Sequence, residues 1–172
     1  MIKSLIVLLA LLAPTTAAAH VTVSPSEAPA NSYAKLSFRV PHGCQGSPTV
    51  RIRLQIPEGV TAVKPQVHPL WKINTTMRPL AQPYQSHGKT ITETVNEVIW
   101  SEGSLPDNLM DEFHVSVKLP DQAGQVLAFP VVQECQQGIY RWIQVAKPGE
   151  DPDSLAEPAP LLKLTPSHGD HH

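Results

Sequence analysis

Residues 50–56 have the sequence Val50-Arg51-Ile52-Arg53-Leu54-Gln55-Ile56, in which apolar and polar residues alternate without a break. Successive side chains of a β-strand point to opposite faces, so this alternation predicts a strand with one buried and one solvated face. Pro57-Glu58-Gly59 follows at once and predicts a turn. Because the signal recurs and no window shows a convincing helical period, the sequence predicts an all-β fold, an antiparallel two-sheet sandwich.

The other strands follow from the same alternation. They are expected at residues 21–23, 36–40, 93–100, 113–119, 126–132, 140–145 and 161–164. Pro130 interrupts one of these runs and, lacking a backbone N–H, must lie at a bulge or an unpaired position. Residues 64–87 carry four prolines and are predicted to be an irregular connection with some strand near 71–75. Residues 147–160 are rich in proline and acidic residues and are expected to cross the surface.

Composition limits the class of protein. A chain of 172 residues with 41% hydrophobic and 16% charged residues suits one domain, with or without a tail. Eighteen prolines against nine glycines argue against a mainly helical protein. A formal charge of −2 without a Lys/Arg cluster gives no footprint for nucleic acid.

The first residues have the pattern of a secretory signal peptide. Lys3 supplies a positive start, residues 5–13 form an apolar block too short to span a bilayer, and Ala17-Ala18-Ala19 suits signal peptidase. The sequence therefore predicts a signal peptide at 1–19, a domain at 20–165 and a His-rich disordered tail at 166–172. Cleavage would make His20 the N-terminus of a periplasmic protein that does not span the membrane.

The expected export of the protein determines how its cysteines are interpreted. Cys44 and Cys135 are the only two in the chain. In an oxidising compartment, such a pair favours a structural disulfide over a metal site. The bridge would close a loop of about 90 residues.

His20 would carry two nitrogen donors at a free N-terminus, the α-amine and imidazole Nδ1. The reference pKa is about 7.7 to 8.0 for an α-amine and about 6.5 for an imidazole, so metal binding displaces a proton at moderate cost near neutrality. Two such nitrogens and a third from elsewhere suit Cu(II), an arrangement called a histidine brace. The residues alone leave open the alternative that a histidine follows the cleavage site by chance.

Several motifs are spread in order along the expected mature chain. They include His20-Val21-Thr22-Val23-Ser24-Pro25, Phe38-Arg39-Val40-Pro41-His42-Gly43-Cys44, Ile56-Pro57-Glu58-Gly59-Val60, Leu105-Pro106-Asp107, Phe129-Pro130-Val131-Val132-Gln133-Glu134-Cys135 and Arg141-Trp142. Together they resemble the exported YcnI-like family. The resemblance implies a cupredoxin-like or immunoglobulin-like β-sandwich that binds Cu(II) through its N-terminal histidine and is associated with copper handling.

One part of the family pattern is missing. The resemblance implies that Bacillus-type members use a glutamate early in the third strand at the metal site. At the corresponding positions this chain has Thr49-Val50-Arg51, which includes no carboxylate. His42 is our candidate for the third nitrogen, since pairing of residues 21–24 with 36–41 would return it beside the chain start. Trp142 matches the family's tryptophan and would cover the metal. Glu134 is a weaker candidate for a carboxylate at the metal or close to it, the alternative being a solvated acid at a strand end.

The remaining candidates carry less chemistry. Asp111 and Glu112 are adjacent and would point to opposite sides of a strand, which suits turn or supporting roles better than acid/base catalysis. His114 is expected on a solvated face, and His68 in the irregular stretch. The tail histidines His168, His171 and His172 could capture metal loosely or be inert. Exposed soft ligands are scarce, which favours Cu(II) over Cu(I).

Three functions compete on this basis. The first is a copper-binding protein, not an enzyme, that works in copper homeostasis or trafficking like a metallochaperone, with a periplasmic copper chaperone or membrane copper transporter as partner. The second is a copper-dependent oxygenase acting on polysaccharides, which would need an open coordination position and a flat aromatic face. The third is a metal-free interaction domain. No hydrolase motif such as Gly-x-Ser-x-Gly or His-Glu-x-x-His occurs.

Overall fold

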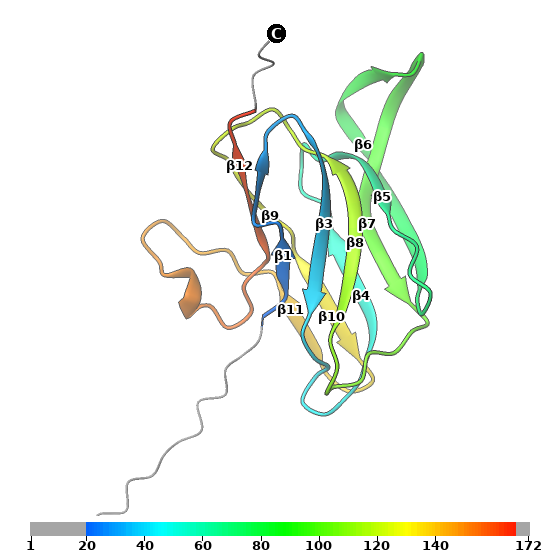
Figure 1. Ribbon diagram of the computed structural model, residues 1–172, viewed down its shortest axis with the longest axis vertical. Helices are drawn as coiled ribbons and strands as arrows, with labels where there is room; N and C mark the ends of the chain where they lie inside the picture. The colour runs from blue at the N-terminus through cyan, green and yellow to red at the C-terminus, as the bar shows by residue number, and fades with distance from the viewer. Residues whose placement is uncertain (1–19, 168–172) are drawn as a thin grey trace, which may run out of the picture.

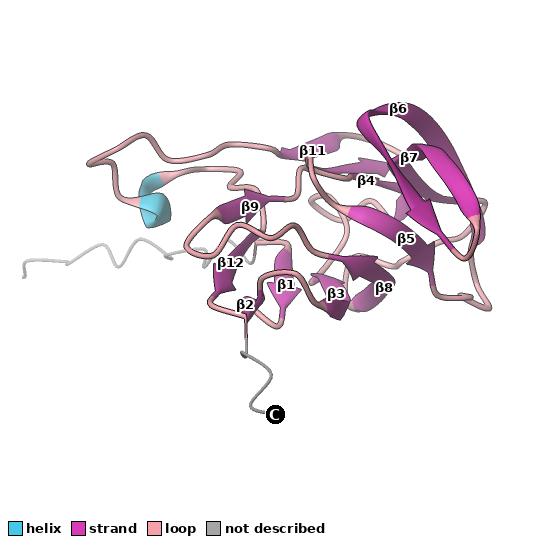
Figure 2. Ribbon diagram, turned by 90° about the horizontal axis from the view of Figure 1, so that it is seen from above, coloured by secondary structure: helices cyan, strands magenta, loops and turns pink. Residues whose placement is uncertain are grey.

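Two antiparallel sheets form the body of the protein, as the computed structural model shows for residues 20–167 (Figure 1). The signal peptide predicted at 1–19 and most of the predicted tail lie outside the described residues. The first sheet has the order β1-β3-β8-β5, formed by Thr22–Ser24, Tyr33–Val40, Asp111–Lys118 and Thr61–Pro65. The second has the order β11-β10-β4-β7-β6, formed by Ile139–Trp142, Val131–Cys135, Thr49–Gln55, Lys89–Ser101 and Lys72–Ser86. The predicted all-β sandwich is confirmed, and Figure 2 shows the two layers from above.

A small third sheet, which the sequence did not predict, closes one side of the sandwich. It consists of β2 (Glu27–Pro29), β12 (Leu161–Thr165) and β9 (Val126–Ala128). The β2 and β12 strands run parallel, so the fold is not purely antiparallel. A single 3-10 turn (Pro152–Ser154) lies in the surface connection before β12.

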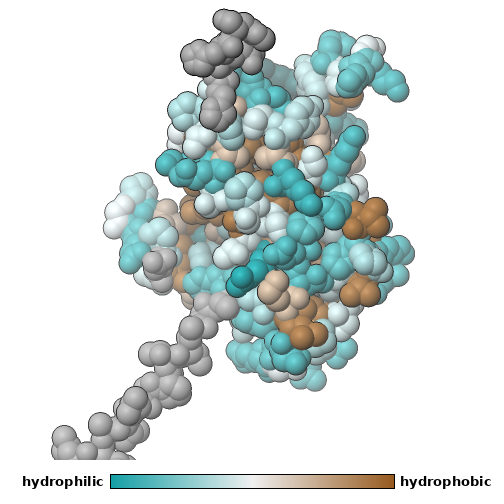
Figure 3. All heavy atoms as spheres, in the orientation of Figure 1, coloured by the Kyte–Doolittle hydropathy of each residue, from teal (hydrophilic) through white to brown (hydrophobic). Residues whose placement is uncertain are grey.

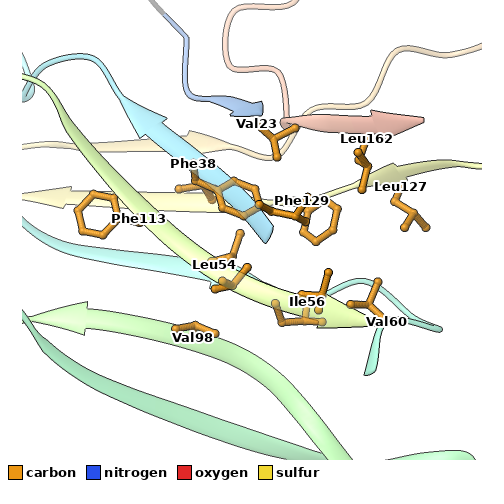
Figure 4. Close-up of a cluster of buried hydrophobic side chains, with 14 of the residues drawn as sticks. Val23, Phe38, Leu54, Ile56, Val60, Val98, Phe113, Leu127, Phe129 and Leu162 are labelled. Carbon is orange, nitrogen blue, oxygen red and sulfur yellow. The ribbon is translucent and has the colours of Figure 1, made fainter. Parts of the chain in front are cut away.

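The core lies between the two main sheets (Figure 4). Phe38 and Phe113 project from the first sheet and Leu54 from the second, and all are at most 1% exposed. Phe129 lies in the connection between β9 and β10, with its ring centroid 5.4 Å from that of Phe38. Each such side chain contributes about 1.5 to 3 kcal/mol by burial. The alternation within residues 50–56 therefore works as predicted, with Ile52, Leu54 and Ile56 all buried.

Prolines explain the two main errors in the strand prediction. The expected strand at 126–132 is two strands in different sheets, because Pro130 has no N–H for a ladder; its carbonyl accepts from the N–H of Gln55 at 2.9 Å. The expected irregular stretch at 64–87 instead contains all of β6, the longest strand, whose Pro79 and Pro83 are tolerated because β6 is an edge strand. The strand expected at 140–145 ends at Trp142.

The exposed side chains of one face are mostly hydrophilic (Figure 3). On the face in Figure 3, hydrophobic residues form small separate groups among hydrophilic ones. Within residues 20–167, no helix is both long enough and apolar enough to cross a membrane.

Candidate metal centre

His20 lies directly before β1, at one edge of the first sheet. The β1 strand pairs antiparallel with β3, with Thr22 opposite Arg39 and Val23 opposite Phe38. This is the pairing that the sequence predicted. Continued by two residues, the register sets His20 opposite Pro41, the residue before His42. The topology therefore brings the two predicted histidines to the same end of the sandwich.

A row of aromatic rings connects the two histidines. The ring centroid of His20 lies 5.7 Å from that of Trp142. Trp142 lies 5.1 Å from Tyr140, its neighbour on the same face of β11. Tyr140 in turn lies 6.3 Å from His42, edge to face. His20 thus contacts Trp142 and His42 contacts Tyr140; we call these two adjacent side chains, Tyr140 and Trp142, the aromatic pair.

The His42 imidazole is held in one tautomer. Its Nδ1 lies 2.6 Å from the carbonyl oxygen of Gly43, which can only accept, so Nδ1 carries the proton. The lone pair therefore lies on Nε2, the atom that remains available for a metal. Histidine ligands commonly have this arrangement, with the second ring nitrogen donating to a carbonyl group.

A hydrogen bond to Gln133 holds the indole of Trp142 in place. Trp142 is only 3% exposed, and its Nε1–H donates to Oε1 of Gln133 at 3.0 Å. The amide nitrogen of Gln133 donates to the backbone carbonyl of His42 at 2.7 Å. Sequence reasoning missed both Gln133 and Tyr140. The available signal was a polar residue on the inward face of a strand, two positions after Val131.

Glu134 points away from this end of the molecule. Its carboxylate lies 2.9 Å from Arg51 and 3.8 Å from Arg53, on the face of β10 opposite Gln133. The structure therefore places Glu134 in an ion-pair cluster on the outer face of the second sheet, away from the aromatic pair. Thr49, at the position where a carboxylate was missing, is fully buried and accepts a hydrogen bond from Gln133.

Asp111 belongs to a separate network. Its carboxylate accepts from Nε1 of Trp71 at 3.0 Å and lies 3.1 Å from Nε2 of His68. The His68 ring stacks on Phe113 with centroids 5.5 Å apart. This network attaches the segment before β6 to the start of β8. Of the other acid and histidine candidates, Glu112 and His114 lie 3.8 Å apart on the outer face of the first sheet.

The predicted disulfide is confirmed. Cys44 and Cys135 are bonded, with their Cα atoms 6.1 Å apart. Cys44 lies two residues after His42, and Cys135 lies two residues after Gln133. The bridge therefore fixes the loop that carries His42 to the strand that carries Gln133.

The metal donors predicted at this end are the nitrogens of His20 and His42. Among residues 20–167, no three His, Cys, Asp or Glu side chains lie close enough together to hold a metal ion. The α-amine that cleavage would expose is not among those side chains. The residues present fit a site in which His20 supplies two nitrogens and His42 supplies Nε2, because the two rings contact adjacent members of the aromatic pair, Trp142 and Tyr140 respectively.

These features define a class of protein: an immunoglobulin-like β-sandwich with an aromatic-backed histidine pair at one end. Residues 20–164 match the model of the family described as a domain of unknown function, DUF1775. The chain belongs to this family, which confirms the resemblance drawn from the motifs.

Two relatives extend the comparison. The chain is 26% identical over 154 residues to the copper-binding protein CutI of Bacillus subtilis, a match that covers 89% of this chain and 69% of the relative. A crystal structure of an uncharacterized protein from Nocardia farcinica, described as having an immunoglobulin-like fold, is similar with a TM-score of 0.62 and 25% identity. That match covers 85% of this chain and 98% of the other. Neither relative is named as an enzyme.

Proposed function

We propose that the mature protein binds one Cu(II) ion through a histidine brace formed by His20, with His42 Nε2 as the third nitrogen. The observation that carries this proposal is that the register of β1 with β3 brings His20 and His42 to one end of the sandwich, where His20 contacts Trp142 and His42 contacts its neighbour Tyr140. Similarity to a copper-binding protein supports the choice of metal. Three neutral nitrogens suit the tetragonal preference of Cu(II).

The residues around the metal would each have a stated task. The His20 amine and Nδ1 would chelate, and the hydrogen bond from His42 Nδ1 to Gly43 would keep Nε2 directed as a donor. Trp142 would cover one side of the ion and exclude water there. With no carboxylate among these donors, the bound ion would keep its positive charge.

The biological role that we propose is copper homeostasis or trafficking in the periplasm, after export directed by residues 1–19. A site at the chain start, on an edge strand, suits transfer of the ion to or from a partner better than permanent storage. The partner would be a periplasmic copper chaperone or a membrane copper transporter. Copper is the cargo in this proposal, and no reaction is assigned.

The decisive experiment uses protein that begins at His20, with its N-terminal mass verified. Calorimetric titration and EPR should report one Cu(II) per chain with nitrogen ligands. A variant with one alanine ahead of His20 keeps every side chain but converts the amine to an amide. We expect its affinity to fall at least about 100-fold, since even changes outside the ligand shell cost about 10- to 100-fold.

Two His→Asn substitutions, one at the proposed ligand and one at a distant turn, provide the matched control. His42→Asn should weaken binding and change the EPR spectrum, whereas His87→Asn, at the β6–β7 turn, should change neither. Asparagine tolerates the positive φ of 47° at His87. Wild-type affinity and spectrum in the extended variant would refute the brace.

A further inference from the structure

Gln133 is a polar side chain buried in an apolar core. It is 0% exposed and lies on the inward face of β10, on the same face as the buried Val131. Burying an amide is costly unless its hydrogen bonds are made. Here its carbonyl oxygen and both of its N–H groups have partners.

The partners join the two halves of the candidate site. Oε1 accepts from Trp142 Nε1 at 3.0 Å, and Trp142 packs against the His20 ring. Nε2 donates to the His42 carbonyl at 2.7 Å and to Thr49 Oγ1 at 2.8 Å. One side chain thus contacts both the indole that backs His20 and the backbone of His42.

The amide can satisfy this environment in only one orientation. A flipped amide would set its N–H groups against the indole N–H of Trp142. Its oxygen would then face the carbonyl oxygen of His42, where both atoms are acceptors. The network therefore fixes the indole and the His42 backbone relative to each other.

We propose that Gln133 is a positioning residue for the copper site, which holds Trp142 and the His42 backbone in the binding arrangement before the metal arrives. This inference rests on the proposed function. Fully satisfied buried polar networks rigidify the core around them, and groups behind metal ligands commonly fix the orientation of those ligands. Gln133 does not touch the metal in this account and acts through the two residues that it holds.

The test compares two glutamines in the mature, correctly processed protein. Gln133→Met keeps the length of the side chain and removes all three hydrogen bonds. Gln55→Met is the matched control, because half-buried Gln55 also donates through Nε2, to the carbonyl and side chain of Asn96, at the far end of β4. Circular dichroism verifies the fold of each variant first.

We expect Gln133→Met to bind Cu(II) about 10- to 100-fold more weakly than the wild type. Its EPR spectrum should show altered or multiple sets of copper parameters, a change that a loss of stability alone would not produce. Gln55→Met should keep the wild-type affinity and spectrum even if its unfolding midpoint falls.

The outcomes separate the two proposals. A folded Gln133→Met variant with wild-type affinity and spectrum would overturn the positioning role and leave the copper site standing. Failure of the wild type itself to bind Cu(II) would overturn the proposed function and this inference with it. If Gln133→Met does not fold, Gln133→Asn takes its place, because an amide shorter by one methylene cannot keep both the bond to Trp142 Nε1 and the bond to the His42 carbonyl. An unchanged affinity and spectrum in Gln133→Asn would then overturn the inference.

Discussion

Removing the disulfide should cost this protein much of its stability. The variant replaces Cys44 and Cys135 together by alanine, so no lone thiol remains. The sequence separation of the bridge is 91 residues. In the chain-entropy model, a closed loop of that length restricts the unfolded chain by about 4.6 kcal/mol at 25 °C. A domain of this size has a total free energy of unfolding of about 5 to 15 kcal/mol, so the loss would be a large share.

Urea unfolding, followed by tryptophan fluorescence, measures the effect. For an m value of about 2 kcal/mol/M, a loss of about 4.6 kcal/mol lowers the midpoint by about 2.3 M. The control is wild-type protein reduced under denaturing conditions and alkylated only after measurement. It lacks the cross-link but keeps the sulfur atoms, including Cys135 Sγ, which lies 3.5 Å from the Thr49 hydroxyl.

Agreement between the variant and the reduced protein would assign the loss to the cross-link. A fall of less than about 1 kcal/mol in both would refute the reasoning, because the restriction of the unfolded chain would then be absent. A large fall in the variant alone would assign the effect to the sulfur contacts. The same samples, loaded with Cu(II), test whether the bridge also supports the loop that carries His42.

Two further predictions concern the β6–β7 end of the second sheet. Gly103→Ala should lower the free energy of unfolding by about 1 to 3 kcal/mol, because the added Cβ would lie 2.5 Å from the Trp71 ring. Ser104→Ala, at the exposed neighbouring position, should change the free energy of unfolding little. Equal urea midpoints for the two variants would contradict this prediction. The pKa of Lys72 is raised, first by its hydrogen bond to Glu102 and then by the charge of that carboxylate. The small stabilisation from this pair should therefore be present below the ordinary lysine pKa and be lost as pH rises through the higher folded value. NMR titration of the Lys72 side chain should show the raised pKa, and Glu102→Gln should return it to the ordinary value; an identical titration in both proteins would contradict the assignment.

Local alternation was enough to predict the strands that face the core. The β4 prediction succeeded because Ile52 and Leu54 are buried on one face, as period-2 reasoning describes directly. The pairing of β1 with β3 was also accessible, since the two strands are joined by a short connection. The disulfide followed from the cysteine count and the expected compartment.

Non-local relations were beyond the sequence. The parallel pairing of β2 with β12 joins Glu27 to Lys163, and no local pattern specifies a contact at that separation. The β6 strand was hidden by its prolines, which count against a strand only when the position requires a ladder N–H. The role of Gln133 could not be predicted either, because its partners Trp142 and His42 come from other parts of the chain and meet only in the fold.

The fold also bears on the proposal that His20, once it is the chain terminus, serves as an ordered ligand. An α-amine on a mobile end would have to be ordered when the metal binds, at about 1 to 2 kcal/mol for each residue fixed. Here Val21 is 2% exposed and Val23 is 9% exposed, and β1 is paired with β3. Folding has therefore already ordered the residues next to His20. Because β1 is an edge strand, the same anchoring leaves His20 half-buried instead of enclosed, and a cavity of about 260 Å³ borders it between β1 and residues 158–161. The N-terminal chelate that we propose would therefore combine an ordered backbone with access for the ion, and the proposed transfer of copper to or from a partner requires both.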